Sequence, residues 1–154
     1  MKDSDIKYIV IHCSATPPRS NIGAKTIDQW HKDRGWSGIG YHVVVRRDGT
    51  LEFGRPFDKV GAHAYGVNRV SWGVCMIGGV DANGNAVDNF TAEQYVSLGL
   101  IVDALQTRAP DAEVLGHRDL SPDIDGDGVI EKWEWTKQCP CFNARQWYVQ
   151  HVAA

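Results

Sequence analysis

Residues 6–13, IKYIVIHC, decide the fold of this chain of 154 residues. The run is almost unbroken in apolar and β-branched side chains, which is typical of a central strand buried on both faces of a sheet. Period-two alternation puts Tyr8, Val10 and His12 on one face, and Ile11 and Cys13 on the other. His12 therefore lies at the end of a rigid strand, just before the polar loop SATPPRSN, where functional side chains are often held.

The rest of the chain alternates between strand and helix signals. Further strands are predicted at residues 41–47, 50–54, 73–78 and 113–116, and Asp48-Gly49 is a strong hairpin turn between the first two. Capping patterns predict three helices. Their markers are Thr26 with Gln29 for a short helix ending near Gly35, Thr91 with Gln94 for a longer helix ending at Pro110, and Asn143 for a last helix. This order predicts one α/β domain, residues 1–154, with a central mixed β-sheet flanked by helices.

Composition excludes several classes of function. The apolar fraction of 43% and the six tryptophans are typical of a globular protein, and the net charge of −3 gives no electrostatic case for nucleic-acid binding. No apolar run approaches the length that spans a membrane. Residues 1–5 are polar and lack a secretory signal, so we expect a product of the cytoplasm.

Three side chains form a candidate metal site. His12, His117 and Cys139 each lie where a strand or loop is predicted to end, and two imidazoles with one thiol are a plausible first set of ligands for a catalytic zinc with one open position. A lone histidine at a strand end is more often structural, and Cys141 is a competing thiol. Cys13 and Cys75 lie inside apolar runs and are expected to pack as small hydrophobic residues.

The order of motifs resembles a known family over nearly the whole chain. The stretches are IVIHCSAT, IDQWHKDRGW, GYHVVVRRDGT, VGAHAYGVN, GVCMIGGVD, FTAEQ, GHRDLSP and TKQCPCFN. Together they are similar to the phage type-2 N-acetylmuramoyl-L-alanine amidases of the peptidoglycan-recognition superfamily. The resemblance implies that fold, and it implies one zinc ion held by His12, His117 and Cys139. It also implies an active-site tyrosine at Tyr41 and an active-site lysine at Lys137.

The same resemblance implies the chemistry. Lys137 would place positive charge where a tetrahedral oxyanion develops, and Tyr41 would orient water or relay its proton toward the leaving amine. His63 and Asn68 match a segment near the substrate cleft, with a structural loop histidine as the alternative for His63. Arg118 and Asp119 are candidates for holding His117, or for pairing with each other.

Between His117 and Lys137 the chain carries DIDGDGVIEKWE, residues 123–134, which some shorter family members lack. The string matches an EF-hand calcium loop position by position, with a solvated acidic loop as the alternative. The predicted calcium ligands are Asp123, Asp125, Asp127, the carbonyl of Val129, and Glu134, with Glu131 acting through water. The short flanks leave no room for a helix pair, so a structural calcium ion is expected rather than a sensor.

The implied substrate is peptidoglycan, cut between N-acetylmuramic acid and L-alanine by a zinc-dependent hydrolase. The expected protein is a monomeric phage endolysin, made in the host cytoplasm, that acts on the periplasmic cell wall after release, with no nucleic-acid or membrane partner. The alternatives are a non-catalytic peptidoglycan-binding module, a polymerase-regulating module of the same fold, and a bacterial wall-recycling amidase. A cysteine hydrolase, with Cys139 as nucleophile and His117 as base, is a further alternative.

Overall fold

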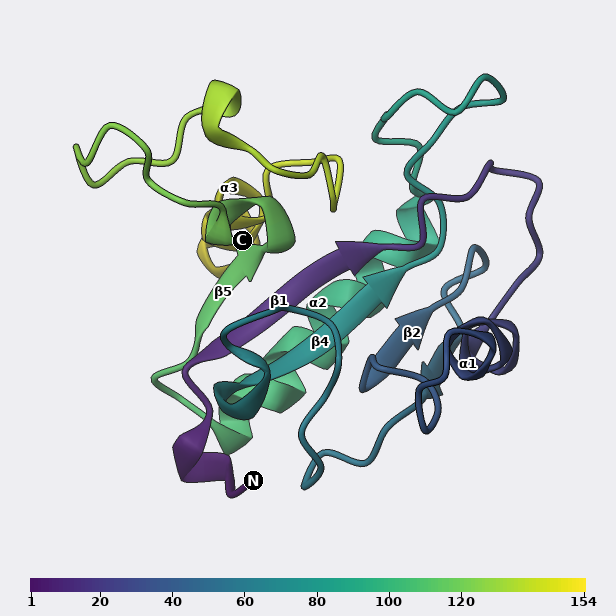
Figure 1. Ribbon diagram of the computed structural model, residues 1–154, viewed down its shortest axis with the longest axis horizontal. Coiled ribbons are helices and arrows are strands. Elements are labelled where there is room, and N and C mark those ends of the chain that lie inside the picture. The colour runs from purple at the N-terminus through teal and green to yellow at the C-terminus, as the bar shows by residue number, and fades with distance from the viewer.

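The computed structural model describes residues 1–154 and contains a five-stranded mixed sheet in the order β3-β2-β4-β1-β5. The strands are β1 (Tyr8–Cys13), β2 (Val43–Val45), β3 (Leu51–Phe53), β4 (Ser71–Met76) and β5 (Glu113–Gly116). β1 pairs in parallel with β4 and β5, and β4 pairs in parallel with β2, while β2 and β3 form an antiparallel hairpin. Figure 1 shows β1 and β4 side by side at the centre. The predicted mixed α/β sheet is confirmed.

β1, β2 and β3 are shorter than the sequence predicts, whereas β5 has its predicted bounds. β2 covers only the middle of residues 41–47. The flanking residues still bond to neighbouring strands and to the hairpin, because His42 donates to the carbonyl of Gly73 and Arg46 donates to the carbonyl of Thr50. The predicted turn is confirmed: Gly49 has φ 87°, which glycine adopts at little cost, and its N–H donates to the carbonyl of Arg46 (2.9 Å). β4 begins at Ser71, two residues earlier than predicted.

Three helices accompany the sheet: α1 (Ala24–Asp33), α2 (Ala92–Arg108) and α3 (Ala144–Ala153). The cap predictions for α2 and α3 are confirmed, because Thr91 Oγ1 accepts from the N–H of Gln94 and Asn143 Oδ1 accepts from the N–H of Gln146. The Thr26–Gln29 prediction is wrong. α1 begins three residues earlier, with Gly23 rather than Thr26 at its cap position, and Glu52 of β3 accepts the N–H of Ala24 (2.9 Å).

The two faces of the sheet bury different partners. The face that carries Ile9, Ile11 and Val74 packs against α2 and α3 in the main core, and α2 lies behind β1 and β4 in Figure 1. The other face packs Val44 and Cys75 against Ile27 of α1. His12 lies opposite Cys75 in the parallel register and so belongs to this second face. None of the helices combines the length and the apolar composition of a membrane span.

Candidate metal centre

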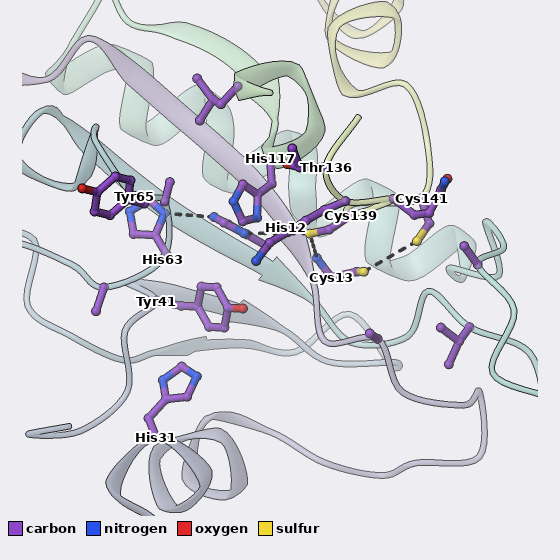
Figure 2. A pocket seen from close by; sticks show the side chains of 18 of the residues that line it. His12, Cys13, His31, Tyr41, His63, Tyr65, His117, Thr136, Cys139 and Cys141 are labelled. Carbon is purple, nitrogen blue, oxygen red and sulfur yellow. Dashed lines mark hydrogen bonds between the residues drawn. The ribbon is translucent and has the colours of Figure 1, made fainter. Parts of the chain in front are cut away.

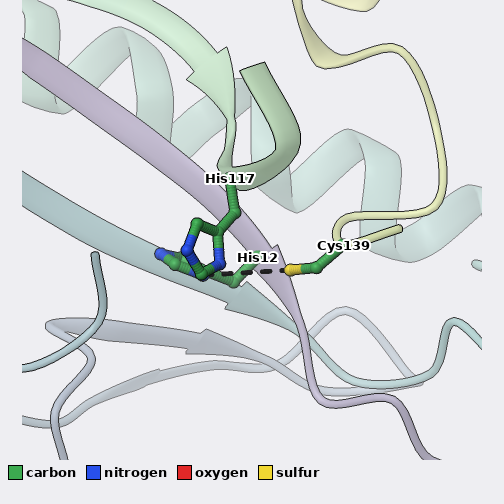
Figure 3. A group of neighbouring side chains, drawn as sticks. All are labelled: His12, His117 and Cys139. Carbon is green, nitrogen blue, oxygen red and sulfur yellow. Dashed lines mark hydrogen bonds between the residues drawn. The ribbon is translucent and has the colours of Figure 1, made fainter. Parts of the chain in front are cut away.

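The two imidazoles and the thiol predicted from the sequence meet at one point (Figure 3). Ligand atoms of His12, His117 and Cys139 all lie within 4.8 Å of one another. Nδ1 of His12 is 3.9 Å from Sγ of Cys139, and the rings of His12 and His117 are 4.5 Å apart between centroids. The fold therefore brings His12 to two side chains that lie more than a hundred positions later in the sequence.

Parallel pairing of β1 with β5 accounts for this meeting. The carboxyl ends of neighbouring parallel strands share one edge of a sheet, so side chains at those ends become neighbours. His12 is the penultimate residue of β1, and His117 follows the last residue of β5 directly. Cys139 arrives on the returning segment, where its carbonyl accepts the N–H of Arg118 (2.9 Å).

Arg118 and Asp119 have partners other than the ring of His117. The Arg118 guanidinium lies 3.8 Å over the ring of Trp135, a cation–π contact. The Asp119 carboxylate accepts the N–H of Gly116 (2.8 Å) and lies 3.8 Å from Arg145. The Asp119 side chain therefore holds the backbone just before His117, and neither side chain hydrogen-bonds to the imidazole of His117.

Sγ of Cys139 receives a hydrogen bond from the backbone N–H of Cys13 at 3.2 Å. This bond fixes the position of the sulfur, the atom through which a cysteine binds metal. Cys141 is turned elsewhere, and its Sγ lies 3.8 Å from Sγ of Cys13 (Figure 2). Cys75 is buried as predicted, whereas Cys13 is buried but faces Cys141 rather than an apolar cluster.

Burial keeps the histidines neutral. Desolvation, followed by repulsion from His63, His117 and Lys137, holds the pKa of His12 well below its usual range. Desolvation and the Lys137 charge lower the pKa of His117 to about 4. A neutral imidazole is the form that offers a lone pair to a metal, so both rings are ready as ligands at neutral pH.

The three donors lie in an open cleft of about 1100 Å³, which also contains Tyr41 and Lys137 in its lining. The Tyr41 ring lies 5.1 Å from the His12 ring between centroids, and burial raises the pKa of its phenol well above the usual value (Figure 2). Tyr41 therefore stays protonated and can donate a hydrogen bond into the cleft. Exposed Trp36 and Tyr65 lie on the same lining, and sequence reasoning missed both.

His63 and Asn68 also line the cleft, but each is engaged within the protein. Nδ1 of His63 is 2.9 Å from Nε2 of His12, and Nε2 of His63 is 3.2 Å from Oγ of Ser71. The amide oxygen of Asn68 accepts the backbone N–H groups of His63 and Ala64, each at 2.9 Å. Sequence reasoning missed Ser71, whose only signal is a hydroxyl at the start of an apolar strand.

Residues 123–129 form an exposed loop, and the segment ends in a 3-10 turn at Lys132–Glu134, where Glu134 is buried. Carboxylates gather there in two groups, Asp123 with Asp125 and Glu134, and Asp125 with Asp127 and Glu131. The Asp123 carboxylate accepts the N–H groups of Gly126 (2.8 Å) and Gly128 (2.7 Å). One buried oxygen of Glu131, Oε2, has no hydrogen-bond partner.

Comparison with known proteins gives a family. Residues 2–141 match the N-acetylmuramoyl-L-alanine amidase family, which is nine-tenths of the chain. The chain belongs to the N-acetylmuramoyl-L-alanine amidase family. It is 39% identical to the endolysin of Enterobacteria phage K11 over 146 residues, covering 95% of this chain and 87% of that protein. The predicted enzyme class, a peptidoglycan amidase of the endolysin type, is confirmed.

Solved structures agree with the fold. The amidase LysC from Clostridium intestinale superposes with a TM-score of 0.73 at 29% identity, covering 98% of this chain and 85% of that chain. Bumblebee PGRP-SA, at 21% identity, shares the fold with a TM-score of 0.70, covering 92% of this chain and 79% of that chain. The expected amidase and peptidoglycan-recognition fold is thereby confirmed.

Proposed function

We propose that this amidase hydrolyses the bond between the lactyl group of N-acetylmuramic acid and the L-alanine of the stem peptide, with a zinc ion held by His12, His117 and Cys139. One observation carries the proposal: two neutral imidazoles and a thiol converge within 4.8 Å in an open cleft. This donor set is one that catalytic zinc uses, with a fourth position left for water or substrate.

The donors fit the ion. A nitrogen and a sulfur on one tetrahedral zinc lie about 3.5 Å apart, and Nδ1 of His12 lies 3.9 Å from Sγ of Cys139. The N–H of Cys13 donates a hydrogen bond to that sulfur, and the low pKa of His117 keeps its lone pair free of protons at neutral pH. When bound, zinc supplies a Lewis acid for the carbonyl and lowers the pKa of water.

Tyr41 and Lys137 supply the remaining groups in this proposal. A protonated phenol beside His12 can donate a hydrogen bond that orients the attacking water or the substrate carbonyl. Lys137 lines the same cleft, and its charge lowers the pKa of both His12 and His117. A fixed positive charge there stabilises the oxyanion that forms when the amide carbonyl is attacked.

The enzyme is expected to act on the cell wall after release from the host cytoplasm, in line with its phage endolysin relatives. We expect it to work as a monomer, because one chain supplies every donor and the whole cleft. Exposed Trp36 and Tyr65 offer apolar surfaces on which sugar rings or stem-peptide carbons can pack.

Release of free N-terminal alanine from purified sacculi tests the reaction. We expect activity that a strong chelator removes and that added zinc restores, while His12→Ala stays inactive with or without zinc. A cysteine hydrolase would remain active in chelator. Sustained alanine release by zinc-free protein would therefore contradict the proposal.

We also propose that residues 123–134 bind one calcium ion through Asp123, Asp125, Asp127, the Val129 carbonyl and Glu134. Two observations favour a cation over a merely solvated loop. The Glu131 Oε2 atom is buried without a partner, and the neighbouring Glu134 carboxylate raises the pKa of Glu131 to about 7. A hard cation would relieve this crowding of carboxylates and order the segment that leads to Lys137 and Cys139.

A further inference from the structure

A chain of hydrogen bonds runs from β4 through the cleft wall to His12. It joins Oγ of Ser71 to Nε2 of His63 at 3.2 Å, and Nδ1 of His63 to Nε2 of His12 at 2.9 Å. Figure 2 shows the second of these bonds. The opposite nitrogen of His12, Nδ1, faces Sγ of Cys139 at 3.9 Å. The two nitrogens of each imidazole therefore face two different neighbours in the chain.

The directions of these bonds follow from the first one. The Ser71 hydroxyl has one proton, and it donates to the carbonyl of Val67 at 2.8 Å, its shorter contact. Oγ of Ser71 is then an acceptor for His63, so His63 carries its proton on Nε2. A neutral imidazole has one N–H and one lone pair, so Nδ1 of His63 accepts the N–H of His12. His12 is therefore protonated on Nε2 and has its lone pair on Nδ1.

The position of the His63 ring is held independently of these bonds. A Cβ on Gly73 would lie 2.6 Å from Cγ of His63, and a Cβ on Gly61 would lie 2.7 Å from its Cδ2. The absence of a side chain at both glycines thus leaves the room that the His63 ring occupies. The amide oxygen of Asn68 fixes the backbone on the other side, through the N–H groups of His63 and Ala64.

We propose that His63, held by Ser71, is a positioning residue that fixes the His12 tautomer so that Nδ1 presents its lone pair to the zinc ion. The inference rests on the proposed zinc centre and gives His63 a role different from a substrate contact. A hydrogen bond on the far nitrogen of a ligand histidine sets its ring orientation and raises its basicity, and losing such a partner typically lowers metal affinity about 10–100-fold.

Matched variants at position 63 test the proposal by competition of zinc with a fluorescent chelator. His63→Leu keeps similar bulk but has no acceptor, and we expect zinc to bind roughly 10–100-fold more weakly. His63→Asn puts an amide oxygen near the place of Nδ1, and we expect it to restore affinity to within about threefold of the original. Thermal unfolding of both zinc-free variants checks that each is folded at the assay temperature.

A second measurement reads the tautomer itself. Long-range ¹H–¹⁵N spectra of histidine-labelled, zinc-loaded protein should show His12 protonated on Nε2 and coordinated through Nδ1. Ser71→Ala removes the acceptor for His63 and should weaken the preference of zinc-free His63 for its Nε2–H form. If His12 coordinates through Nε2, the proposal is wrong however the variants behave.

The outcomes separate this inference from the zinc centre. If His12→Ala binds zinc as tightly as the original protein, the proposed centre is wrong. If His12→Ala loses zinc while His63→Leu keeps full zinc affinity, the zinc centre stands and only the positioning role of His63 is wrong. A rise in KM for His63→Leu with unchanged zinc affinity would instead make His63 a substrate contact.

Discussion

Cys139 and Cys141 stand two residues apart, yet only one thiol faces the imidazoles. Sγ of Cys139 lies 3.9 Å from Nδ1 of His12, whereas Sγ of Cys141 lies 3.8 Å from Sγ of Cys13. Cys141 has φ 70°, so the backbone turns between the two residues and sends their side chains in different directions. A short motif that contains two equivalent thiols therefore yields one candidate ligand.

The roles proposed for Tyr41 and Lys137 predict a loss of turnover without a loss of metal. Tyr41→Phe and Lys137→Ala should each lower kcat on the order of a hundredfold, because each removes a polar group from the transition state. Steady-state alanine release and zinc content, measured on the same preparations, check this. If both variants kept near-native turnover with zinc bound, the proposed mechanism would be wrong.

Buried His42 predicts an acid-sensitive fold. Its Nε2 donates to the carbonyl of Lys59 (2.9 Å), its Nδ1 accepts the N–H of Gly73 (3.1 Å), and burial lowers its pKa. The native ring resists a proton that the unfolded chain takes up at pH of about 6.5. The stability it contributes is therefore present above that pH and is lost as pH falls below it.

Thermal unfolding of zinc-free protein across pH 7 to 5 checks this expectation. His42→Asn keeps an acceptor for Gly73 and removes the titrating ring. It should be less stable than the original protein at pH 7 but should lose less of its remaining stability on acidification. Equal slopes for the two proteins would exclude His42 as a source of the acid sensitivity.

The candidate site was predictable in part from residue types and order. His12, His117, Cys139, Tyr41 and Lys137 follow from motifs, and they share one cleft. The hydrogen bond between His12 and His63 joins residues 51 positions apart that tertiary packing brings together. No periodic pattern in the sequence predicts it. A hydrogen bond of this kind can be found only from the three-dimensional structure.

At the scale of elements, Thr91 connects the start of α2 to the β2–β3 hairpin. Its Oγ1 accepts the N–H of Gln94 (3.1 Å) and donates to the carbonyl of Arg47 (2.6 Å). Thr91→Ala should lower the free energy of unfolding by about 1 kcal/mol, as loss of a helix cap typically does. Urea unfolding monitored by circular dichroism measures the difference.

Thr26→Ala is the matched control for that prediction. Thr26 lies inside the first turn of α1, where alanine is the better helix former, so the change should be neutral or slightly stabilising. If Thr26→Ala lowered the free energy of unfolding by about 1 kcal/mol, Thr26 would act as a helix cap, as the sequence predicts. If Thr91→Ala left the free energy of unfolding unchanged, Thr91 would not stabilise the protein as a helix cap.

The sequence predicts which helices and strands form better than it predicts where they begin and end. The start of α1 shows the physical reason. A capping box is a local signal, but a carboxylate from another strand can satisfy the first N–H groups equally well. Glu52 does this for Ala24 across the sheet edge, and the helix starts there. Where the cap is local, as at Thr91 and Asn143, sequence and structure agree.

The loop at residues 123–134 predicts a calcium effect. Millimolar calcium should raise the melting temperature, because an ion that binds only the folded loop stabilises it. Asp125→Ala should abolish the rise, since Asp125 belongs to both carboxylate groups. Asp88→Ala, outside the loop, should leave the rise intact. No calcium-dependent shift in the original protein would defeat the proposed calcium site.

At the scale of the whole molecule, one face of the sheet forms the main hydrophobic core and the other carries the cleft. The large core against α2 and α3 holds β1, β4 and β5 in register. The opposite face has less cover near the strand ends, and the cleft lies there with His12 in its lining. A rigid strand end therefore carries the candidate ligand, while the loops around it shape access for a long polymer.

Zinc content per chain, measured by elemental analysis, tests the central claim most directly when Cys139→Ser is compared with Cys141→Ser. We predict one zinc ion per chain in the original protein and in Cys141→Ser, and little or none in Cys139→Ser after equal dialysis. Full zinc occupancy in Cys139→Ser, or loss of zinc in Cys141→Ser alone, would contradict a centre built from His12, His117 and Cys139.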